Sequence, residues 1–113
     1  MKLDRKARIL VIDDEENIRK SLKMILEYDG YVFYEAADGE SGLQAIDEIP
    51  GLDLVLLDIH LPGRDGLEIL KEIRNRPFPP EVVMISGQGT VQTAVEATKL
   101  GAFEFLEKPL HRD

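Results

Sequence analysis

Residues 9–16 read ILVIDDEE, a run of four apolar residues followed at once by four acids. A short, continuously apolar run is typical of a strand that is covered on both faces of a parallel sheet. The pattern recurs at residues 54–58, LVLLD, where a second apolar run ends in Asp58. If both runs are parallel strands of one sheet, their carboxyl ends bring Asp13, Asp14 and Asp58 to one edge, where open α/β sheets bind ligands.

Three carboxylates at one edge would repel one another unless a cation neutralises them, so the pattern predicts a bound metal or a shifted pKa. Mg²⁺ takes oxygen ligands and commonly combines one or two carboxylates with water and phosphate oxygens. Each acid also has a structural interpretation, because Asp13 and Asp14 could cap a following helix and Asp58 could form a turn. The conjunction of all three favours a magnesium site.

The bulk composition limits the possible functions. A chain of 113 residues forms one domain. Its net charge of -8 argues against direct binding of nucleic acid, because that affinity comes mostly from cations that meet phosphates. The absence of cysteine excludes disulfides, a thiolate nucleophile and a zinc–thiolate site. No stretch is long enough to span a membrane or to form a signal peptide, so we expect a cytoplasmic protein.

Apolar periodicity and turn residues predict five strands that alternate with four helices. We expect strands at residues 9–12, 31–36, 53–58, 82–85 and 103–106, and helices at 15–28, at 39–49, around Leu67, Leu70 and Ile73, and from Val91 until Gly101. In the fourth helix we expect Val91, Ala94 and Val95 to face the core. Strict alternation requires parallel pairing with right-handed crossovers. The predicted fold is therefore α/β, a doubly wound five-stranded parallel sheet in the flavodoxin-like order 2-1-3-4-5.

Two more polar residues follow strands at the same edge. Ser86 ends the fourth strand, where its hydroxyl could donate to a phosphoryl oxygen, and Lys108 follows the fifth, where its ammonium could act as a point charge on phosphate. The alternatives are a helix-capping or turn serine and an ordinary solvated lysine. We do not expect His60 to bind metal through its imidazole, and its carbonyl is the better candidate ligand. Core packing is the default role for Phe105.

With these positions identified, the chain resembles the receiver domain of bacterial two-component response regulators, and in particular the receivers of NtrC-like transcriptional activators. The resemblance covers residues 8–110. It rests on Asp13-Asp14, Asp58 with Leu61-Pro62-Gly63 and Asp65-Gly66, Ile85-Ser86-Gly87 and Lys108-Pro109, with Gly89-Thr90 and Gly101-Ala102-Phe103 for the narrower group.

The resemblance implies a phosphorylation switch rather than an enzyme that acts on other molecules. Asp58 would accept a phosphoryl group from a sensor histidine kinase. Asp14 would bind Mg²⁺ directly, Asp13 would act largely through a bound water, and Asp58 and the carbonyl of His60 would complete the ligands.

Ser86 and Lys108 would then hold the phosphoryl oxygens, and Phe105 would be the aromatic residue that changes position on activation. An added phosphoryl group brings negative charge and strong acceptor oxygens, which Ser86 can move to bond. Such a movement would shift an existing two-state equilibrium and repack the fourth helix and fifth strand, which would control a transcription-activating output domain.

The end of the chain departs from the family pattern. Receivers normally carry a fifth helix after the Lys-Pro turn, whereas this sequence stops at Asp113. We therefore expect residues 1–113 to be a single receiver domain that is truncated after the fifth strand. One face of the sheet would be covered by the first helix alone, and exposed apolar surface usually marks a contact. We expect a homodimer through that face, or through the fourth helix and fifth strand.

Three other functions compete with this interpretation. A haloacid-dehalogenase-type phosphatase also uses an aspartate nucleophile and Mg²⁺, but its nucleophile lies on the first strand and a second aspartate follows two residues later, where this chain has His60 after Asp58. A flavodoxin-like FMN carrier would need hydroxyls and N–H groups where residues 13–16 place four acids, which would repel its phosphate. An unphosphorylated interaction module would be credible if the acids were missing, and they are present.

Overall fold

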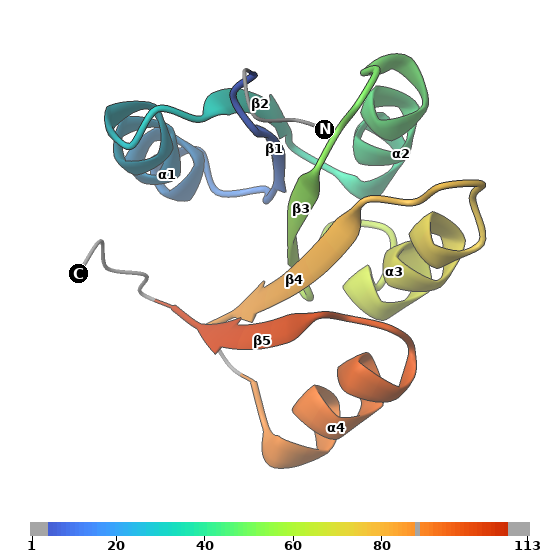
Figure 1. Cartoon of the computed structure of the whole chain (residues 1–113). Coiled ribbons are helices and arrows are strands. Elements are labelled where there is room, and N and C mark those ends of the chain that lie inside the picture. Colours follow the sequence, from blue (N-terminus) through green and yellow to red (C-terminus); the bar gives the residue numbers. More distant parts are fainter. Residues whose placement is uncertain (1–4, 88, 109–113) are drawn as a thin grey trace.

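A five-stranded parallel sheet forms the centre of the protein, in the order β2-β1-β3-β4-β5 (Figure 1). The computed structural model describes residues 5–87 and 89–108. The strands are β1 (Arg8–Ile12), β2 (Val32–Ala36), β3 (Leu54–Asp58), β4 (Glu81–Ser86) and β5 (Glu104–Glu107), and the helices are α1 (Glu16–Tyr28), α2 (Gly39–Glu48), α3 (Gly66–Arg74) and α4 (Val91–Lys99). The predicted fold class and strand order are confirmed.

The predicted element boundaries differ from the observed ones by one or two residues. The first helix begins at Glu16 rather than Glu15, because Glu15 has extended backbone angles and serves as the N-cap. Its other end follows the sequence signal, since Gly30 has a φ of 92° and its N–H donates to the carbonyl of Glu27 at 3.1 Å. A left-handed residue here ends the helix and turns the chain into β2.

The sheet separates two layers of apolar side chains. In Figure 1, α1 lies on one side of the sheet and α2, α3 and α4 lie on the other. The core on the three-helix side is the larger, and its fully buried members include Leu10, Ile12, Leu57, Ile69, Leu70, Ile73 and Met84. Both faces of the central strands are therefore covered, as their continuously apolar sequences require.

The α1 face of the sheet carries less exposed apolar surface than the sequence suggests. Its core residues Ile9, Val11, Leu56, Val83 and Ile85 are each at most 8% exposed. At edge strand β5, the apolar side chain of Leu106 is 38% exposed. The truncation after the fifth strand and the turn at Pro109 concern residues outside the described ranges.

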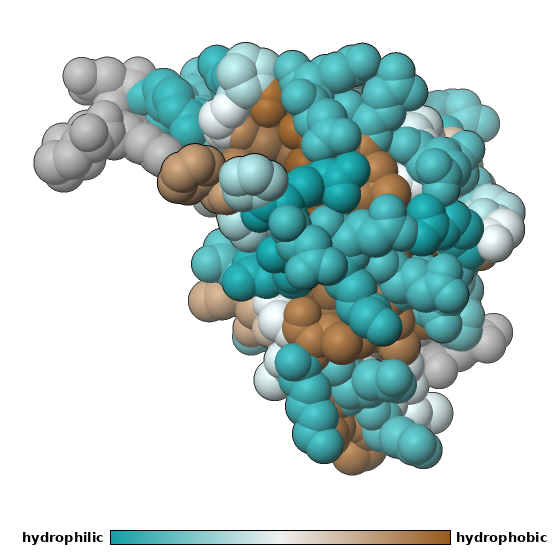
Figure 2. Space-filling view, turned by 90° about the vertical axis from the view of Figure 1, so that its right-hand side faces the viewer, coloured by the Kyte–Doolittle hydropathy of each residue, from teal (hydrophilic) through white to brown (hydrophobic). Residues whose placement is uncertain are grey.

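The orientation predicted for α4 is wrong. Val91 is 82% exposed and Val95 47%, whereas the buried residue of this helix is Ala97. The valines are spaced correctly for one helical stripe, but that stripe faces outward. Space-filling Figure 2, which shows the α2–α3–α4 side, is largely hydrophilic, with hydrophobic patches in both its upper and its lower half. Periodicity identifies an apolar stripe, but it does not decide which side of a short helix meets the core.

Candidate functional site

Four carboxylates converge at the carboxyl edge of the sheet. Ile12 of β1 pairs with Leu57 of β3, so the residues that follow these two lie side by side. Carboxylate oxygens of Asp13, Asp14, Glu15 and Asp58 all lie within 4.8 Å of one another. Asp13 and Asp58 are buried, at 0% and 3% exposure, while Asp14 and Glu15 are open to solvent. The predicted convergence of the three aspartates is confirmed.

The ammonium group of Lys108 reaches into this cluster from the end of β5. The Nζ atom of Lys108 lies 2.8 Å from Asp13 Oδ2, 3.2 Å from Glu15 Oε1 and 3.3 Å from Asp58 Oδ2. The backbone N–H of Lys108 donates to the carbonyl of Ser86 at 2.9 Å, which fixes the start of this side chain beside β4. Lys108 is therefore not an ordinary solvated lysine, since its side chain is only 11% exposed.

Short local hydrogen bonds orient the two buried carboxylates. Asp13 Oδ1 accepts the backbone N–H of Glu15 at 2.9 Å, and Asp58 Oδ1 accepts that of His60 at 3.2 Å. The guanidinium of Arg19 on α1 donates to the carbonyl of Asp13 at 2.8 Å. Both aspartates thus make the turn contacts expected of a structural acid, and each still directs its second oxygen toward Lys108.

The donor set suits a hard cation. Asp13 Oδ2 is fully buried and accepts no hydrogen bond from the residues the structure describes, and its contact is the Lys108 ammonium. Buried polar atoms are normally hydrogen-bonded, so this oxygen, whose described partner is an ion-paired ammonium, has room for a further ligand. Four carboxylates balanced by one ammonium leave a local excess of negative charge, which Mg²⁺ would reduce. The residues present therefore fit the predicted magnesium site.

The electrostatics of the cluster shift two pKa values. Burial raises the pKa of Asp58, and the neighbouring charge of Asp13 raises it further, against the smaller effects of Lys108 and the His60 N–H. Burial alone would lower the pKa of Lys108, but its close contact with Asp13 and the charges of Asp58 and Asp13 outweigh burial and raise it. The site therefore favours the protonated form of Lys108 and makes ionisation of Asp58 harder than that of an exposed aspartate.

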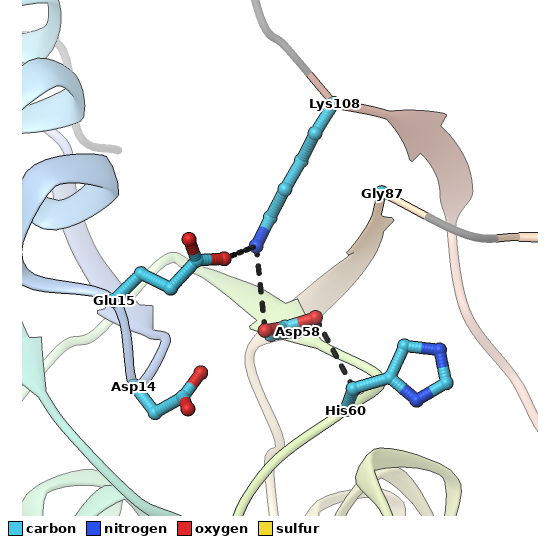
Figure 3. A pocket seen from close by; sticks show the side chains of 6 residues that line it. All are labelled: Asp14, Glu15, Asp58, His60, Gly87 and Lys108. Carbon is cyan, nitrogen blue, oxygen red and sulfur yellow. Dashed lines mark hydrogen bonds and ion pairs between the residues drawn. The ribbon is translucent and has the colours of Figure 1, made fainter.

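The cluster borders an open cleft of about 430 Å³. Its lining residues are Asp14, Glu15, Asp58, His60, Gly87 and Lys108 (Figure 3). Figure 3 shows the imidazole of His60 pointing away from Asp14 and Glu15. The cleft gives a small anionic group direct access to Asp58.

Ser86 and Phe105 lie next to this cleft rather than in its lining. Ser86 ends β4 and is fully buried. It does not cap α4, because Thr90 is the N-cap and its side chain accepts the N–H of Thr93 at 3.1 Å. Phe105 is half-buried on β5, opposite Met84 of β4, and packs against the larger core. The structure thus places both residues on the β4 and β5 side of the site.

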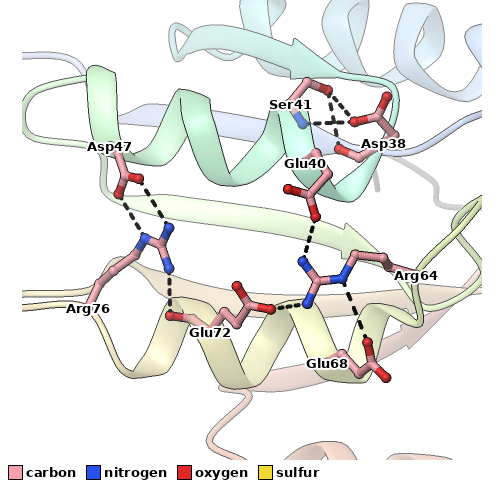
Figure 4. A network of polar contacts seen from close by, with 8 residues as sticks. All are labelled: Asp38, Glu40, Ser41, Asp47, Arg64, Glu68, Glu72 and Arg76. Carbon is pink, nitrogen blue, oxygen red and sulfur yellow. Dashed lines mark hydrogen bonds and ion pairs between the residues drawn. The ribbon is translucent and has the colours of Figure 1, made fainter.

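The β3–α3 loop is held by ion pairs that sequence reasoning missed (Figure 4). The guanidinium of Arg64 donates to Glu40 of α2 at 2.5 Å, lies 3.7 Å from Glu68 and also pairs with Glu72 of α3. A β-bridge between His60 and Asp65 closes the loop. Pairs between separate helices leave no local pattern in the sequence. By contrast, Glu15 was detectable as the third acid of the run at residues 13–16.

Known proteins match this chain over almost its whole length. The family model for the response regulator receiver domain matches residues 9–113. The nitrogen assimilation regulatory protein NtrX of Azorhizobium caulinodans is 43% identical over 107 residues, which cover 93% of this chain and 23% of that protein. The transcriptional regulatory protein FixJ of Bradyrhizobium diazoefficiens is 40% identical over 110 residues, which cover 96% and 52%.

Solved structures agree with these sequence matches. The crystal structure of the receiver domain of NtrX from Brucella abortus superposes with a TM-score of 0.85 at 45% identity, covering 93% of this chain and 88% of that one. The chain spans about a quarter of NtrX from Azorhizobium caulinodans and about half of FixJ. No helix in residues 5–87 and 89–108 is long and apolar enough to cross a membrane.

Proposed function

The chain belongs to the response regulator receiver domain family, and from this premise we propose that it is a switch whose phosphoacceptor is Asp58. The family serves two-component signalling, and the relatives of this chain include transcriptional regulators. The proposed phosphodonor is a phosphohistidine on a sensor kinase. The proposed output is a transcription-activating domain in the same full-length chain.

One observation carries the proposal: Asp58 is a buried carboxylate at the edge of an open cleft, with the Lys108 ammonium 3.3 Å from its Oδ2. An aspartate in this position has the geometry of a nucleophile. Its Oδ1 accepts the N–H of His60, and its Oδ2 faces the ammonium of Lys108. A carboxylate can attack a phosphoryl group without a general base, since it is already ionised.

The transfer balances as a simple displacement. An oxygen of Asp58 attacks the phosphorus of the phosphohistidine, and a P–O bond forms while the P–N bond breaks. The electron pair of the broken bond returns to the imidazole nitrogen, which takes a proton from solvent. The product is an aspartyl phosphate and a neutral histidine on the kinase.

The residues around Asp58 divide the remaining tasks. Lys108 pairs with the oxygens of the transferred group, and its raised pKa keeps it cationic. When bound, Mg²⁺ supplies positive charge that offsets the charge developing on those oxygens. Its proposed ligands are Asp13, Asp14, Asp58 and the backbone carbonyl of His60. Lys108, together with Mg²⁺ held by these ligands, would offset the charge of a group that the four carboxylates alone would repel.

The proposed output uses the β4 and β5 side of the site. Ser86 reorients to donate to a phosphoryl oxygen, and Phe105 occupies the space that this movement frees. Both residues lie beside Gly89 in the loop that leads to α4, so their rearrangement changes the surface formed by α4 and β5. That surface already exposes Val91, Val95 and Phe103, which supports a homodimer through α4 and β5 as the assembled form.

Incubation with acetyl phosphate and Mg²⁺, followed by intact-mass measurement, tests the proposal. We expect one phosphoryl adduct on the wild-type protein and none on Asp58→Asn. Asp29→Asn, which changes an exposed acid at the end of α1, is the matched control and keeps the adduct. A wild-type protein without an adduct, or an adduct that survives Asp58→Asn, would refute Asp58 as the phosphoacceptor.

A further inference from the structure

The backbone of Gly89, in the loop between β4 and α4, lies against the ring of Phe105. A Cβ atom added at Gly89 would be 2.6 Å from both Cε1 and Cζ of that ring, and 3.6 Å from Cβ of Ser86. The optimum separation of non-bonded carbon atoms is about 3.5 to 4.0 Å, and at 2.6 Å either the ring or the loop must shift. The ring therefore rests in a place that is available because residue 89 has no side chain.

Backbone conformation does not explain this glycine. The positive-φ glycines among the described residues are Gly30, Gly51, Gly63 and Gly101, and Gly89 is not among them. Gly87, two residues earlier in the same loop, gives a direct contrast. A Cβ atom there would meet nothing nearer than Lys108 Cδ at 3.9 Å, an ordinary contact. The need for glycine at position 89 comes from the ring.

The ring of Phe105 can move in few directions to make room for a side chain at residue 89. Its strand pairs with β4, where it stands opposite the fully buried Met84. Its ring already packs against the core on the side of α3 and α4. Because protein interiors are close-packed, the ring cannot move deeper, and a side chain at residue 89 would push the ring outward or push the loop away. The positions of the loop and the ring are thus mutually dependent.

We infer that Gly89 is a positioning residue that acts through Phe105, and that contact between the Gly89 backbone and the ring couples the Ser86 loop to β5. The functional part rests on the proposed role of Ser86 and Phe105 in the switch. When the loop moves toward a phosphoryl group on Asp58, the Gly89 backbone moves with Ser86 and releases the ring. A side chain at residue 89 displaces the ring without phosphorylation.

The contact can be tested on the unphosphorylated protein. The chain has four phenylalanines, so fluorine-labelled phenylalanine gives four signals that can be assigned by substitution. We expect Gly89→Ala to shift the Phe105 signal and to leave that of exposed Phe78 in place. Gly87→Ala, the matched control, should leave both unchanged. A folded Gly89→Ala protein whose Phe105 signal is that of the wild type would overturn the inference.

A second pair of variants decides the question if Gly89→Ala is too unstable. Overpacking of this kind lowers the Tm by roughly 5 to 15 °C. In a Phe105→Ala background the ring is absent, and the nearest remaining atom, Ser86 Cβ, is at an ordinary 3.6 Å. We expect Gly89→Ala to leave the Tm of Phe105→Ala unchanged within about 2 °C. A further fall of the same size as in the wild-type background would contradict the steric coupling.

Phosphorylation provides the final comparison. We expect acetyl phosphate and Mg²⁺ to shift the Phe105 signal of the wild type more than that of Gly89→Ala, in which the ring is already displaced. Equal shifts in proteins with equal adduct would refute the role in the switch. If no adduct forms, the proposed function is refuted. The contact between Gly89 and Phe105 is still tested separately, by the Phe105 signal of unphosphorylated Gly89→Ala.

Discussion

Replacing Asp58 by asparagine should stabilise the protein in the absence of Mg²⁺. Asp58 is 3% exposed, so its ionised form has lost most of its hydration, at a cost of several kcal/mol. With an effective dielectric constant of about 20, repulsion from the carboxylate of Asp13 within 4.8 Å adds roughly 3.5 kcal/mol, and attraction to Lys108 at 3.3 Å returns roughly 5 kcal/mol. We expect Asp58→Asn to raise the free energy of unfolding by about 1–3 kcal/mol, or Tm by roughly 4–12 °C.

The difference in stability between Asp58→Asn and the wild type depends on pH because the pKa of Asp58 is raised in the folded protein. Between its ordinary value of 3.8 and its raised folded value, the folded protein binds more protons than the unfolded chain, so wild-type stability falls as the pH rises through this window. Asparagine carries no charge, so the advantage of the variant is absent below the ordinary value and complete above the folded one. Mg²⁺ should reduce the advantage, because it binds the folded wild type more tightly.

Urea unfolding at low ionic strength, at neutral and at acid pH, measures this effect. Asp47→Asn is the matched control, because it also removes one negative charge, but from an exposed carboxylate whose pKa is lowered by its hydrogen bond to Arg76. That control should give no gain. An Asp58→Asn protein that is no more stable than the wild type at neutral pH, or an advantage that is undiminished at acid pH, would show that the charge on Asp58 is not the cause.

Three further outcomes follow from the same geometry. Asp13→Asn and Asp14→Asn should each weaken Mg²⁺ binding by at least about tenfold in calorimetric titrations, since each removes an anionic ligand; unchanged affinity would exclude that residue as a ligand. Gly66→Ala should lower the stability by about 3 kcal/mol or more in chemical denaturation, because its Cβ would lie 2.3 Å from the carbonyl oxygen of Asp58, a backbone atom that cannot move aside; near-wild-type stability would contradict this close approach. Val95→Asp on the exposed face of α4 should shift the phosphorylated protein from dimer to monomer in light scattering; a dimer that persists would place the interface elsewhere.

The sites that sequence reasoning located are those at strand ends. Asp13, Asp14, Asp58 and Lys108 each follow or end an apolar run, and parallel pairing necessarily gathers such positions at one edge. Glu15 was visible in the same run, but nothing in the sequence said that its carboxylate would turn toward Lys108 instead of solvent. That contact depends on where the end of β5 stands relative to α1.

The side that a helix presents to the core was less accessible to sequence reasoning. The valine stripe of α4 is a correct observation about spacing, yet Ala97 occupies the buried position. A small side chain allows a short helix to pack closely on the sheet. The small alanine is therefore buried, although the valines are more hydrophobic. Two other contacts also join distant segments and leave no local pattern in the sequence. Arg64 pairs with acids on α2 and α3, and the ring of Phe105 packs against the backbone of Gly89.

The sequence by itself determined the alternation of strands and helices, the parallel sheet and the meeting of three aspartates, because these follow from continuous apolar runs, from the helical period of 3.6 residues and from the handedness of crossovers. Tertiary structure alone decided which carboxylate oxygens face Lys108, that Asp13 Oδ2 is buried without a hydrogen bond from the described residues, and that Gly89 leaves room for Phe105. Those features depend on differences of a few tenths of an ångström in the distances between segments that are far apart in the chain. Packing sets such distances, and local sequence does not.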